Sequence, residues 1–385
     1  MKANMLIAHG GGPTAVINAS LYGAIEEAKK HNEIGSIYGA LGGTAGILEE
    51  NFIDFKTVDQ KTLDLLPFTP ASSIGTSRFP LYEKEYEQML EVFKKHNIRY
   101  VLFNGGNGSM DTCGRIYKVA QKHDIHVVGI PKTIDNDISV TDHCPGFGSA
   151  ARYLATSVAE VGQDVKSLPI HVSIVEAMGR NAGWIAASSV LARKKEGDAP
   201  HLIYLPEKPF CEEEFLEDVE RLYKKLGGVV VVASEGLKNE KGEPIVPPIF
   251  KTGRATYFGD VSAHLAMLVI QKLGIKARSE KPGILGRASI ALQSEVDRQE
   301  AIEAGKAAAK AACEGKTGVM VGFKRISNEP YSCETIFIPI EEVMMHERKM
   351  PKNFINERGN DVTSAFIKWC KPLIGAELPS YANFR

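Results

Sequence analysis

Two carboxylates stand two residues apart in the segment Pro-Lys-Thr-Ile-Asp-Asn-Asp at 131–137, directly after an apolar run at 127–130. Such a run is typical of a buried parallel strand, and open α/β sheets place their chemistry at the carboxyl ends of their strands. Asp135 and Asp137 could then face one ligand, one accepting a proton from a hydroxyl while the other holds a metal ion. Taken alone, the segment could equally be a turn whose side chains only cap backbone groups.

Two glycine-rich turns stand in similar positions, each between an apolar run and a helical pattern. They are His-Gly-Gly-Gly-Pro-Thr at 9–14 and Asn-Gly-Gly-Asn-Gly-Ser at 104–109. Glycine lets the backbone approach a ligand closely, and a helix start behind the turn offers free N–H groups and a positive dipole end. These features favour phosphate. Neither turn has the GxxxxGK[ST] pattern of a P-loop, and the first lacks the GxGxxG spacing of a dinucleotide site.

Several arginines lie beside further glycine-containing turns. Arg78 follows Gly-Thr-Ser, Arg180 follows Met-Gly, and Arg278 and Arg287 flank another glycine-containing stretch. Most arginines in proteins are solvated surface residues. Beside a glycine turn, however, a guanidinium group is placed as bidentate phosphate binding requires.

The elements that must position these residues alternate between strands and helices. Near-continuous apolar runs, typical of a parallel sheet covered on both faces, occur at 5–8, 100–103, 127–130, 171–175, 202–205, 229–232 and 318–323. Helical spacing of apolar residues occurs at 14–31, 110–122 and 301–314. Residues 236–254 are rich in glycine, proline and lysine, which predicts a loop.

Bulk composition excludes several classes of protein. A length of 385 residues indicates two domains or one large α/β domain. The net charge of −1 gives no general attraction to nucleic acid or to anionic membranes, and no apolar run approaches the roughly 20 residues of a membrane span. The six cysteines are scattered without metal-site spacing, which favours reduced thiols. We therefore expect a cytoplasmic protein without nucleic-acid or membrane partners.

Over nearly its whole length the chain resembles the phosphofructokinase family. Six motifs occur in the family's order, although each alone is only modestly specific. They are Gly-Gly at 11–12, Gly-Thr-Ser-Arg-Phe at 75–79, Gly-Gly-Asn-Gly-Ser at 105–109, the segment at 131–137, Glu-Ala-Met-Gly-Arg-Asn-Ala-Gly-Trp at 176–184 and Ser-Glu-Gly at 234–236.

The resemblance implies an α/β fold of two three-layer α/β/α Rossmann-like domains, with mostly parallel sheets and the active site in the cleft between them. A phosphoryl-donor domain would contain residues 1–145 plus about 286–310. A sugar-phosphate domain would contain residues 146–285 plus about 311–385. A homodimer or homotetramer is also implied, because in the family one arginine of the sugar-phosphate site comes from a neighbouring subunit.

The activity that the resemblance implies is Mg²⁺-dependent phosphoryl transfer to the 1-hydroxyl of fructose 6-phosphate, which gives fructose 1,6-bisphosphate in glycolysis. Asp135 is then the general base, Asp137 assists it near the metal, and Thr133 hydrogen-bonds the transferring phosphoryl group. Arg78 and Arg180 neutralise charge on that group, the effect that dominates this chemistry.

Binding residues follow from the same resemblance. The donor phosphates would be bound at Gly11, Gly12, Gly106, Asn107, Gly108, Ser109 and Lys132. The sugar phosphate would be bound at Met178, Gly179, Arg180, Glu235, Arg278 and Arg287. The metal would be held by Asn107 and Asp137. Asn107 stands where many members have an aspartate, and an amide oxygen is a weaker Mg²⁺ ligand than a carboxylate.

Two markers of the phosphoryl donor disagree. Family members use ATP or pyrophosphate, and a carboxylate at the position of Gly108 accompanies pyrophosphate use; glycine there leaves no such block to ATP. Lys132, by contrast, is the residue that pyrophosphate enzymes have, and the stretches 183–184 and 356–359 also look more like that branch. Because a lysine can bind either donor, we expect ATP as the favoured donor and keep pyrophosphate as the alternative.

Three further alternatives stay open. Ile284 and Gly286 depart from the family's usual sugar-site residues, so a larger acceptor such as sedoheptulose 7-phosphate is possible. A kinase of the NAD or lipid type would account for the turn at 104–109 but not for Asp135. A sugar-phosphate sensor with a decayed site would account for Asn107, but binding alone requires no general base.

Overall fold

The chain forms two compact units in the computed structural model, which describes residues 2–252, 255–382 and 384. Unit 1 contains Met1–Ser149 and Arg287–Arg348, and unit 2 contains Ala150–Gly286 and Lys349–Arg385. Residues 311–348 therefore belong to unit 1, whereas we expected them in the sugar-phosphate domain. The reason is that two strands within them extend the sheet of unit 1.

Unit 1 is built on a seven-stranded sheet. Its order is β13 (Tyr331–Pro339), β12 (Val319–Asn328), β5 (His126–Pro131), β4 (Ile98–Gly105), β1 (Ala3–His9), β2 (Ile34–Ala40) and β3 (Phe52–Asp54). The five inner strands are parallel, and the two edge strands run antiparallel to their neighbours. Since β1, β4 and β5 are buried along nearly their whole length, their apolar residues pack on both faces of the sheet.

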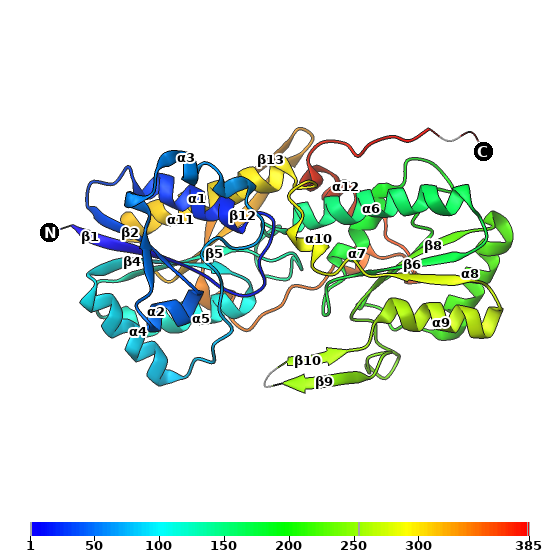
Figure 1. Ribbon diagram of the computed structural model, residues 1–385, viewed down its shortest axis with the longest axis horizontal. Helices are drawn as coiled ribbons and strands as arrows, with labels where there is room; N and C mark the ends of the chain where they lie inside the picture. The colour runs from blue at the N-terminus through cyan, green and yellow to red at the C-terminus, as the bar shows by residue number, and fades with distance from the viewer. Residues whose placement is uncertain (1, 253–254, 383, 385) are drawn as a thin grey trace. The chain divides into compact units, whose positions relative to one another are not determined.

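Helices cover both faces of this sheet (Figure 1). One face carries α1 (Ile17–Ala28), α3 (Gln60–Leu63) and α11 (Glu295–Cys313), and the other carries α2 (Gly43–Leu48), α4 (Glu83–Lys95) and α5 (Asn107–Ala120). Helices α1 and α11 approach closely at Gly23 and Gly305: a side-chain carbon at Gly305 would lie 1.9 Å from the Ser20 carbonyl oxygen. The two glycines therefore allow backbone-to-backbone packing of these helices.

Unit 2 is built on a four-stranded parallel sheet in the order β11 (Ala277–Glu280), β6 (Val172–Ala177), β8 (Val229–Ser234) and β7 (Leu202–Tyr204). Helices α6 (Phe147–Ser167) and α7 (Trp184–Ser188) lie on one face, and α8 (Glu212–Leu226) and α9 (Val261–Leu273) lie on the other (Figure 1). An apolar core fills the space between the sheet and α8 and α9. Two further short α-helices are α10 (Leu285–Ala288) and α12 (Ser364–Cys370).

The expected loop at 236–254 is wrong over part of its length. Strand β9 (Pro248–Thr252) pairs antiparallel with β10 (Ala255–Phe258) as a two-stranded ribbon, and residues 253 and 254 of the expected loop lie outside the described residues. The prolines and lysines of this stretch obscured a strand of only five residues, which is too short to show an apolar period.

The expected α/β class with mostly parallel sheets is confirmed. The expected helices at 14–31 and 110–122 start and end within three residues of α1 and α5, whereas α11 begins six residues before the expected start at 301. All six cysteines, each within the described part of the chain, are free thiols. None of the helices that the structure describes is both long enough and apolar enough to cross a membrane.

Candidate active site

The glycine-rich turns meet at the point where the strand order of unit 1 reverses. Chain connections lead from β1 outward to β2 in one direction and from β4 to β5 in the other, so the turns after β1 and β4 are neighbours. The Gly10 N–H donates to the Asn104 carbonyl over 2.9 Å, and the Lys132 N–H donates to the Gly105 carbonyl over 3.0 Å. Three turns are thus joined at the switch point, where open α/β sheets bind ligands.

Ser109 explains why glycine is needed at two positions of these turns. A side-chain carbon would lie 2.2 Å from Ser109 Oγ at Gly10 and 2.0 Å from it at Gly105. Ser109 is buried in the first turn of α5 and fills the space between the two turns. Its side chain therefore fixes the spacing of the turns, and the predicted phosphate-binding role of Ser109 stays a prediction.

Lys132 connects the segment at 131–137 to the first glycine turn. Its ammonium group donates to the Gly12 carbonyl over 2.6 Å and to the Gly10 carbonyl over 3.1 Å, and the residue is 2% exposed. Burial lowers the pKa of this ammonium to about 8. Gly11, in the left-handed region at φ 73°, lies beside the same group. The turn at 10–12 is therefore shaped around a buried cation.

His9 is a residue of this site that the sequence analysis missed. It is buried at the end of β1, and its Nδ1 lies 2.7 Å from Ser72 Oγ. Burial and the neighbouring Lys132 lower the pKa of His9 to about 3, so the imidazole is neutral near pH 7. The only feature of the sequence that could have marked His9 as a site residue is its position directly before three glycines.

The segment at 133–137 is a fixed loop that its own polar groups shape. The Thr133 N–H donates to the Pro145 carbonyl over 3.1 Å, and Thr133 Oγ1 accepts from the Asp135 N–H over 3.1 Å. Asn136 lies at φ 54°, and its side-chain oxygen accepts from the Cys144 N–H. Asp135 is close enough to Lys132 that its carboxylate partly offsets the effect of burial on the pKa of that lysine.

Asp137 and Asn107 form a donor set that suits a hard cation. Asp137 Oδ2 accepts from Asn107 Nδ2 over 2.9 Å, and Oδ1 of each side chain is buried without a hydrogen-bond partner among the described residues. Burial raises the pKa of Asp137. Two neighbouring acceptor oxygens in a site of this kind are what Mg²⁺ prefers as ligands, so the residues fit the metal that the family resemblance implies.

Arg78 and Arg287 both belong to unit 1. Arg78 is exposed and follows a parallel bridge that joins Ser77 to Gly10. Nη1 of Arg287 lies 2.8 Å from where a side-chain carbon at Gly12 would stand, and its Nε is buried without a hydrogen-bond partner among the described residues. Arg287 thus lies against the first glycine turn, and its predicted role in binding the sugar phosphate stays a prediction.

In unit 2 the turns after β6 and β8 are joined. Gly179, at φ 115°, donates its N–H to Glu235 Oε1 over 3.2 Å, and Ser234 Oγ donates to the Gly179 carbonyl over 2.7 Å. Met178 directly precedes this glycine. The Arg180 guanidinium follows it and lies 5.2 Å from the centre of the Phe258 ring.

Arg278 does not join this group within the chain. It lies on β11 in register with Ser173, five residues before Met178 on the neighbouring strand, and it is exposed. Five residues of strand span roughly 16 Å. The structure therefore brings four of the five unit-2 residues of the predicted site together and leaves Arg278 apart.

Asp297 is a second residue that the sequence analysis missed. Its buried carboxylate accepts from the N–H groups of Gly146 and Ser149, over 2.8 and 2.9 Å, and from Ser149 Oγ over 2.6 Å. These bonds fix the start of α6, directly after the loop that carries Asp135. No local pattern marks Asp297, because its partners lie about 150 residues earlier in the chain.

Comparison with known proteins decides the family. The family model described as Phosphofructokinase matches residues 4–312, well over half of the chain. The chain belongs to the phosphofructokinase family. The fold, the glycine turns and the loop at 131–137 are thus those of a phosphofructokinase family member.

Full-length relatives share both sequence and fold with this phosphofructokinase family member. It is 38% identical to the pyrophosphate–fructose 6-phosphate 1-phosphotransferase of Xanthomonas campestris pv. campestris, over 98% of this chain and 93% of the relative. It is 37% identical to the protein of the same name from Rhodospirillum rubrum, over 100% and 97%. The crystal structure of a pyrophosphate-dependent phosphofructokinase from Nitrosospira multiformis matches with a TM-score of 0.90 at 37% identity, over 99% of this chain and 94% of that one.

These relatives correct the expected phosphoryl donor. The three relatives just described are all named for pyrophosphate, so the expectation of ATP as the favoured donor is wrong. A side-chain carbon at Gly108 would have no atom within 4 Å, so the position does leave open space. An open space removes an obstacle to a nucleotide but supplies no contact that would bind one. Lys132 was the more informative of the two markers.

Proposed function

We propose that this protein transfers a phosphoryl group reversibly between pyrophosphate and the 1-hydroxyl of fructose 6-phosphate, in the presence of Mg²⁺. The products of the forward reaction are fructose 1,6-bisphosphate and orthophosphate. The observation that carries the proposal is the similarity, over nearly the full length, to relatives named for this reaction. The buried cation beside the glycine turns supports it, because pyrophosphate is a compact and highly charged ligand.

Unit 1 supplies most of the groups for the chemical step, and unit 2 supplies Arg180. Asp135 accepts the proton of the 1-hydroxyl as its oxygen attacks the terminal phosphorus of pyrophosphate, and the bond to the bridging oxygen breaks to release orthophosphate. Lys132 and Arg287 lie where they neutralise phosphate charge beside Gly12. Thr133, Arg78 and Arg180 have the family's role of stabilising the transferring group.

Asn107 and Asp137 would hold the metal ion through their two unpartnered oxygens. When bound, Mg²⁺ neutralises charge on the phosphate oxygens and orients them. Because Asn107 Nδ2 donates to Asp137 Oδ2, the Oδ1 atom of each side chain would be available to bind a cation. Because only Asp137 of these two residues carries a negative charge, the donor phosphates would supply most of the negative charge around the metal.

Unit 2 supplies the residues for the sugar phosphate. The hydrogen bond between Glu235 and Gly179 holds two turns in one arrangement, so a sugar would meet Met178, Gly179 and Glu235 as a preformed set. Arg278, which lies apart within the chain, is placed to act in a homo-oligomer, where the family uses an arginine from a neighbouring subunit. Fructose 6-phosphate is the proposed acceptor.

A two-donor assay tests the proposal. The purified protein is incubated with fructose 6-phosphate and Mg²⁺, with pyrophosphate or ATP supplied separately, and fructose 1,6-bisphosphate is measured. We expect turnover with pyrophosphate at least about 100-fold faster than with ATP. Turnover with ATP and none with pyrophosphate would refute the proposed donor, and no turnover with either would refute the proposed activity. Sedoheptulose 7-phosphate in place of fructose 6-phosphate tests the choice of acceptor.

A further inference from the structure

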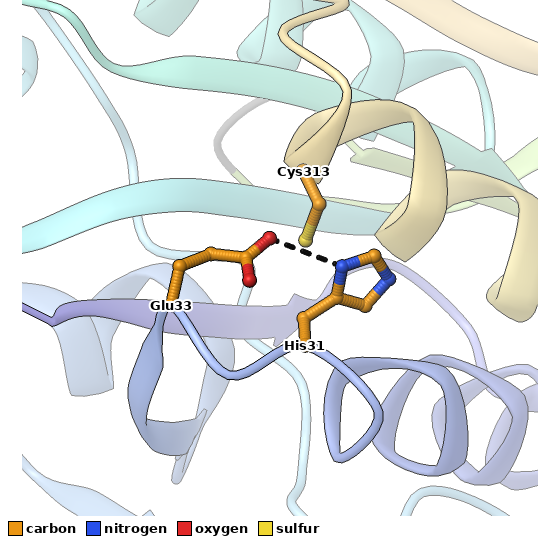
Figure 2. A group of neighbouring side chains, drawn as sticks. All are labelled: His31, Glu33 and Cys313. Atoms are coloured by element: carbon orange, nitrogen blue, oxygen red, sulfur yellow. Dashed lines mark hydrogen bonds and ion pairs between the residues drawn. The ribbon is translucent and has the colours of Figure 1, made fainter.

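A second group of ligating side chains lies in unit 1, outside the candidate active site (Figure 2). His31 and Glu33 stand between the end of α1 and the start of β2, and Cys313 is the last residue of α11. One ligand atom of each residue lies within 4.8 Å of the other two. His31 Nδ1 is 3.1 Å from Glu33 Oε1, and in Figure 2 the Cys313 sulfur points toward this same pair.

Glu27 orients the imidazole of this group. Its Oε1 lies 3.4 Å from His31 Nε2, on the side of the ring opposite Glu33. A carboxylate on the far nitrogen is the arrangement that holds a metal-binding histidine in place and keeps its proton on that nitrogen. Nδ1 is then the atom left to face Glu33 and Cys313, and a cation would replace the hydrogen between Nδ1 and Glu33.

Charge and access also favour a cation here. Helices α1 and α11 both end at this point, so the negative ends of two helix dipoles point toward the group. The side chain of Glu33 is half-exposed and that of His31 is 21% exposed, which gives an ion a path from solvent. Cys313 is partly buried, with intermediate exposure, like His31.

We propose that His31, Glu33 and Cys313 bind one Zn²⁺ ion, which joins the end of α1 to the end of α11. A thiolate, an imidazole and a carboxylate form a donor set typical of Zn²⁺, whereas Mg²⁺ and Ca²⁺ prefer oxygen ligands alone. Water completes the fourth position. The Cys313 thiol and the Nδ1–H of His31 that faces Glu33 each give up a proton to solvent when the ion binds, so the group exchanges two protons for the metal.

A second cluster of potential metal ligands shows why we place the site at His31, Glu33 and Cys313. His143, Glu300 and Cys333 also lie close together, but His143 contacts Asp142 over 2.9 Å and Glu300 over 2.6 Å, and it is 2% exposed. Arg325 already pairs with Asp142 there. That imidazole is almost completely buried between two carboxylates, whereas the side chain of His31 is 21% exposed. Cys333 therefore serves as the matched control for Cys313.

Binding of Zn²⁺ and of Co²⁺, a spectroscopic substitute, to the full-length protein tests the proposal. Equilibrium dialysis is done with excess Mg²⁺, which occupies the separate site at Asn107 and Asp137. We expect one Zn²⁺ per chain at about 1 µM free ion and a sulfur-to-cobalt charge-transfer band in the near ultraviolet. Cys313→Ser should abolish the band and weaken Zn²⁺ binding at least about 100-fold, while Cys333→Ser should leave both unchanged.

Two further variants keep the test decisive if Cys313→Ser fails to fold. Glu33→Gln changes a half-exposed side chain and should weaken binding at least about tenfold, and Glu27→Gln should weaken it by about 10- to 100-fold through the imidazole. Circular dichroism and turnover with pyrophosphate should be unchanged in these variants, since none of them lies in the proposed active site. Failure of the wild-type chain to bind Zn²⁺, or binding that Cys333→Ser removes and Cys313→Ser does not, would overturn the proposal.

Discussion

The two units present their charged side chains in different ways. In unit 1, Lys132 is almost completely buried and bonded to the glycine turn, and burial raises the pKa of Asp137. In unit 2, Arg180 and Arg278 are exposed, and the buried contacts of the turns come from backbone groups and Glu235. Buried charges that are fixed in advance suit a chemical step, whereas exposed guanidinium groups suit capture of an anion from solvent. Under the proposed function, the comparison assigns the chemical step mainly to unit 1 and recognition mainly to unit 2; the exposed Arg78 of unit 1 and Arg180 of unit 2, both proposed to act on the transferring group, depart from this division.

The largest effect is expected from removing the proposed base in unit 1. Asp135→Asn keeps the shape of the side chain but cannot accept a proton, so kcat should fall by about 1,000-fold with little change in KM for fructose 6-phosphate. Steady-state kinetics with pyrophosphate measure both constants. Asp124→Asn, an exposed position in the same unit, is the control. A kcat within tenfold of wild type would remove Asp135 from its role and with it the assignment of chemistry to unit 1.

The rigidity of the unit-1 turns can be tested separately from their chemistry. Gly10→Ala would push a methyl group into Ser109, so we expect a loss of about 1–3 kcal/mol in the free energy of unfolding. Gly286→Ala in unit 2 would meet only ordinary contacts with Tyr153 and should change that free energy by less than about 1 kcal/mol. Urea unfolding curves compare the two. Equal losses would show that the turn at Gly10 is no more tightly packed than the stretch at Gly286.

The recognition role of unit 2 predicts an effect on binding alone. Arg278→Gln should raise KM for fructose 6-phosphate by about tenfold and leave kcat nearly unchanged, because a charge-assisted hydrogen bond to the 6-phosphate is lost. Arg221→Gln, an exposed arginine of the same unit, should change neither constant. If Arg278→Gln lowered kcat and left KM unchanged, the division of roles between the units would be wrong.

The smallest effect is a pH dependence that belongs to unit 1. Burial lowers the pKa of Lys132 to about 8, so its ammonium is charged below pH 8 and loses its proton above it. KM for pyrophosphate should therefore rise above pH 8, by up to about tenfold per pH unit, while KM for fructose 6-phosphate stays flat. Lys132→Met should show a high KM for pyrophosphate at all pH values, without this rise. A rise that persists in the variant would assign it to another group.

Local patterns in the sequence predicted much of the fold and the main residues of the site. The apolar runs at 5–8, 100–103 and 127–130 became β1, β4 and β5, and each is followed by a turn with site residues. These predictions succeeded because a strand buried on both faces must be apolar along its length. Strand β13 was not predicted, because its exposed edge carries polar residues at alternate positions.

Contacts between distant parts of the chain could not be predicted. The sequence shows Ser109 beside glycines but not that its hydroxyl stands between two turns 95 residues apart. Likewise, nothing local to Arg287 shows that it lies against Gly12, and nothing local to Asp297 shows that it fixes the start of α6. The expected phosphoryl donor was wrong for a related reason. Open space at Gly108 does not show which contacts the surrounding residues provide to a ligand.

Formation of pyrophosphate in the reverse reaction tests the proposed donor most directly. The protein is incubated with fructose 1,6-bisphosphate, orthophosphate and Mg²⁺, and the products are followed by phosphorus NMR. The proposed function predicts pyrophosphate and fructose 6-phosphate in equal amounts, with both lost in Asp135→Asn. Absence of pyrophosphate from the wild-type reaction, in a preparation that phosphorylates fructose 6-phosphate with ATP, would contradict it.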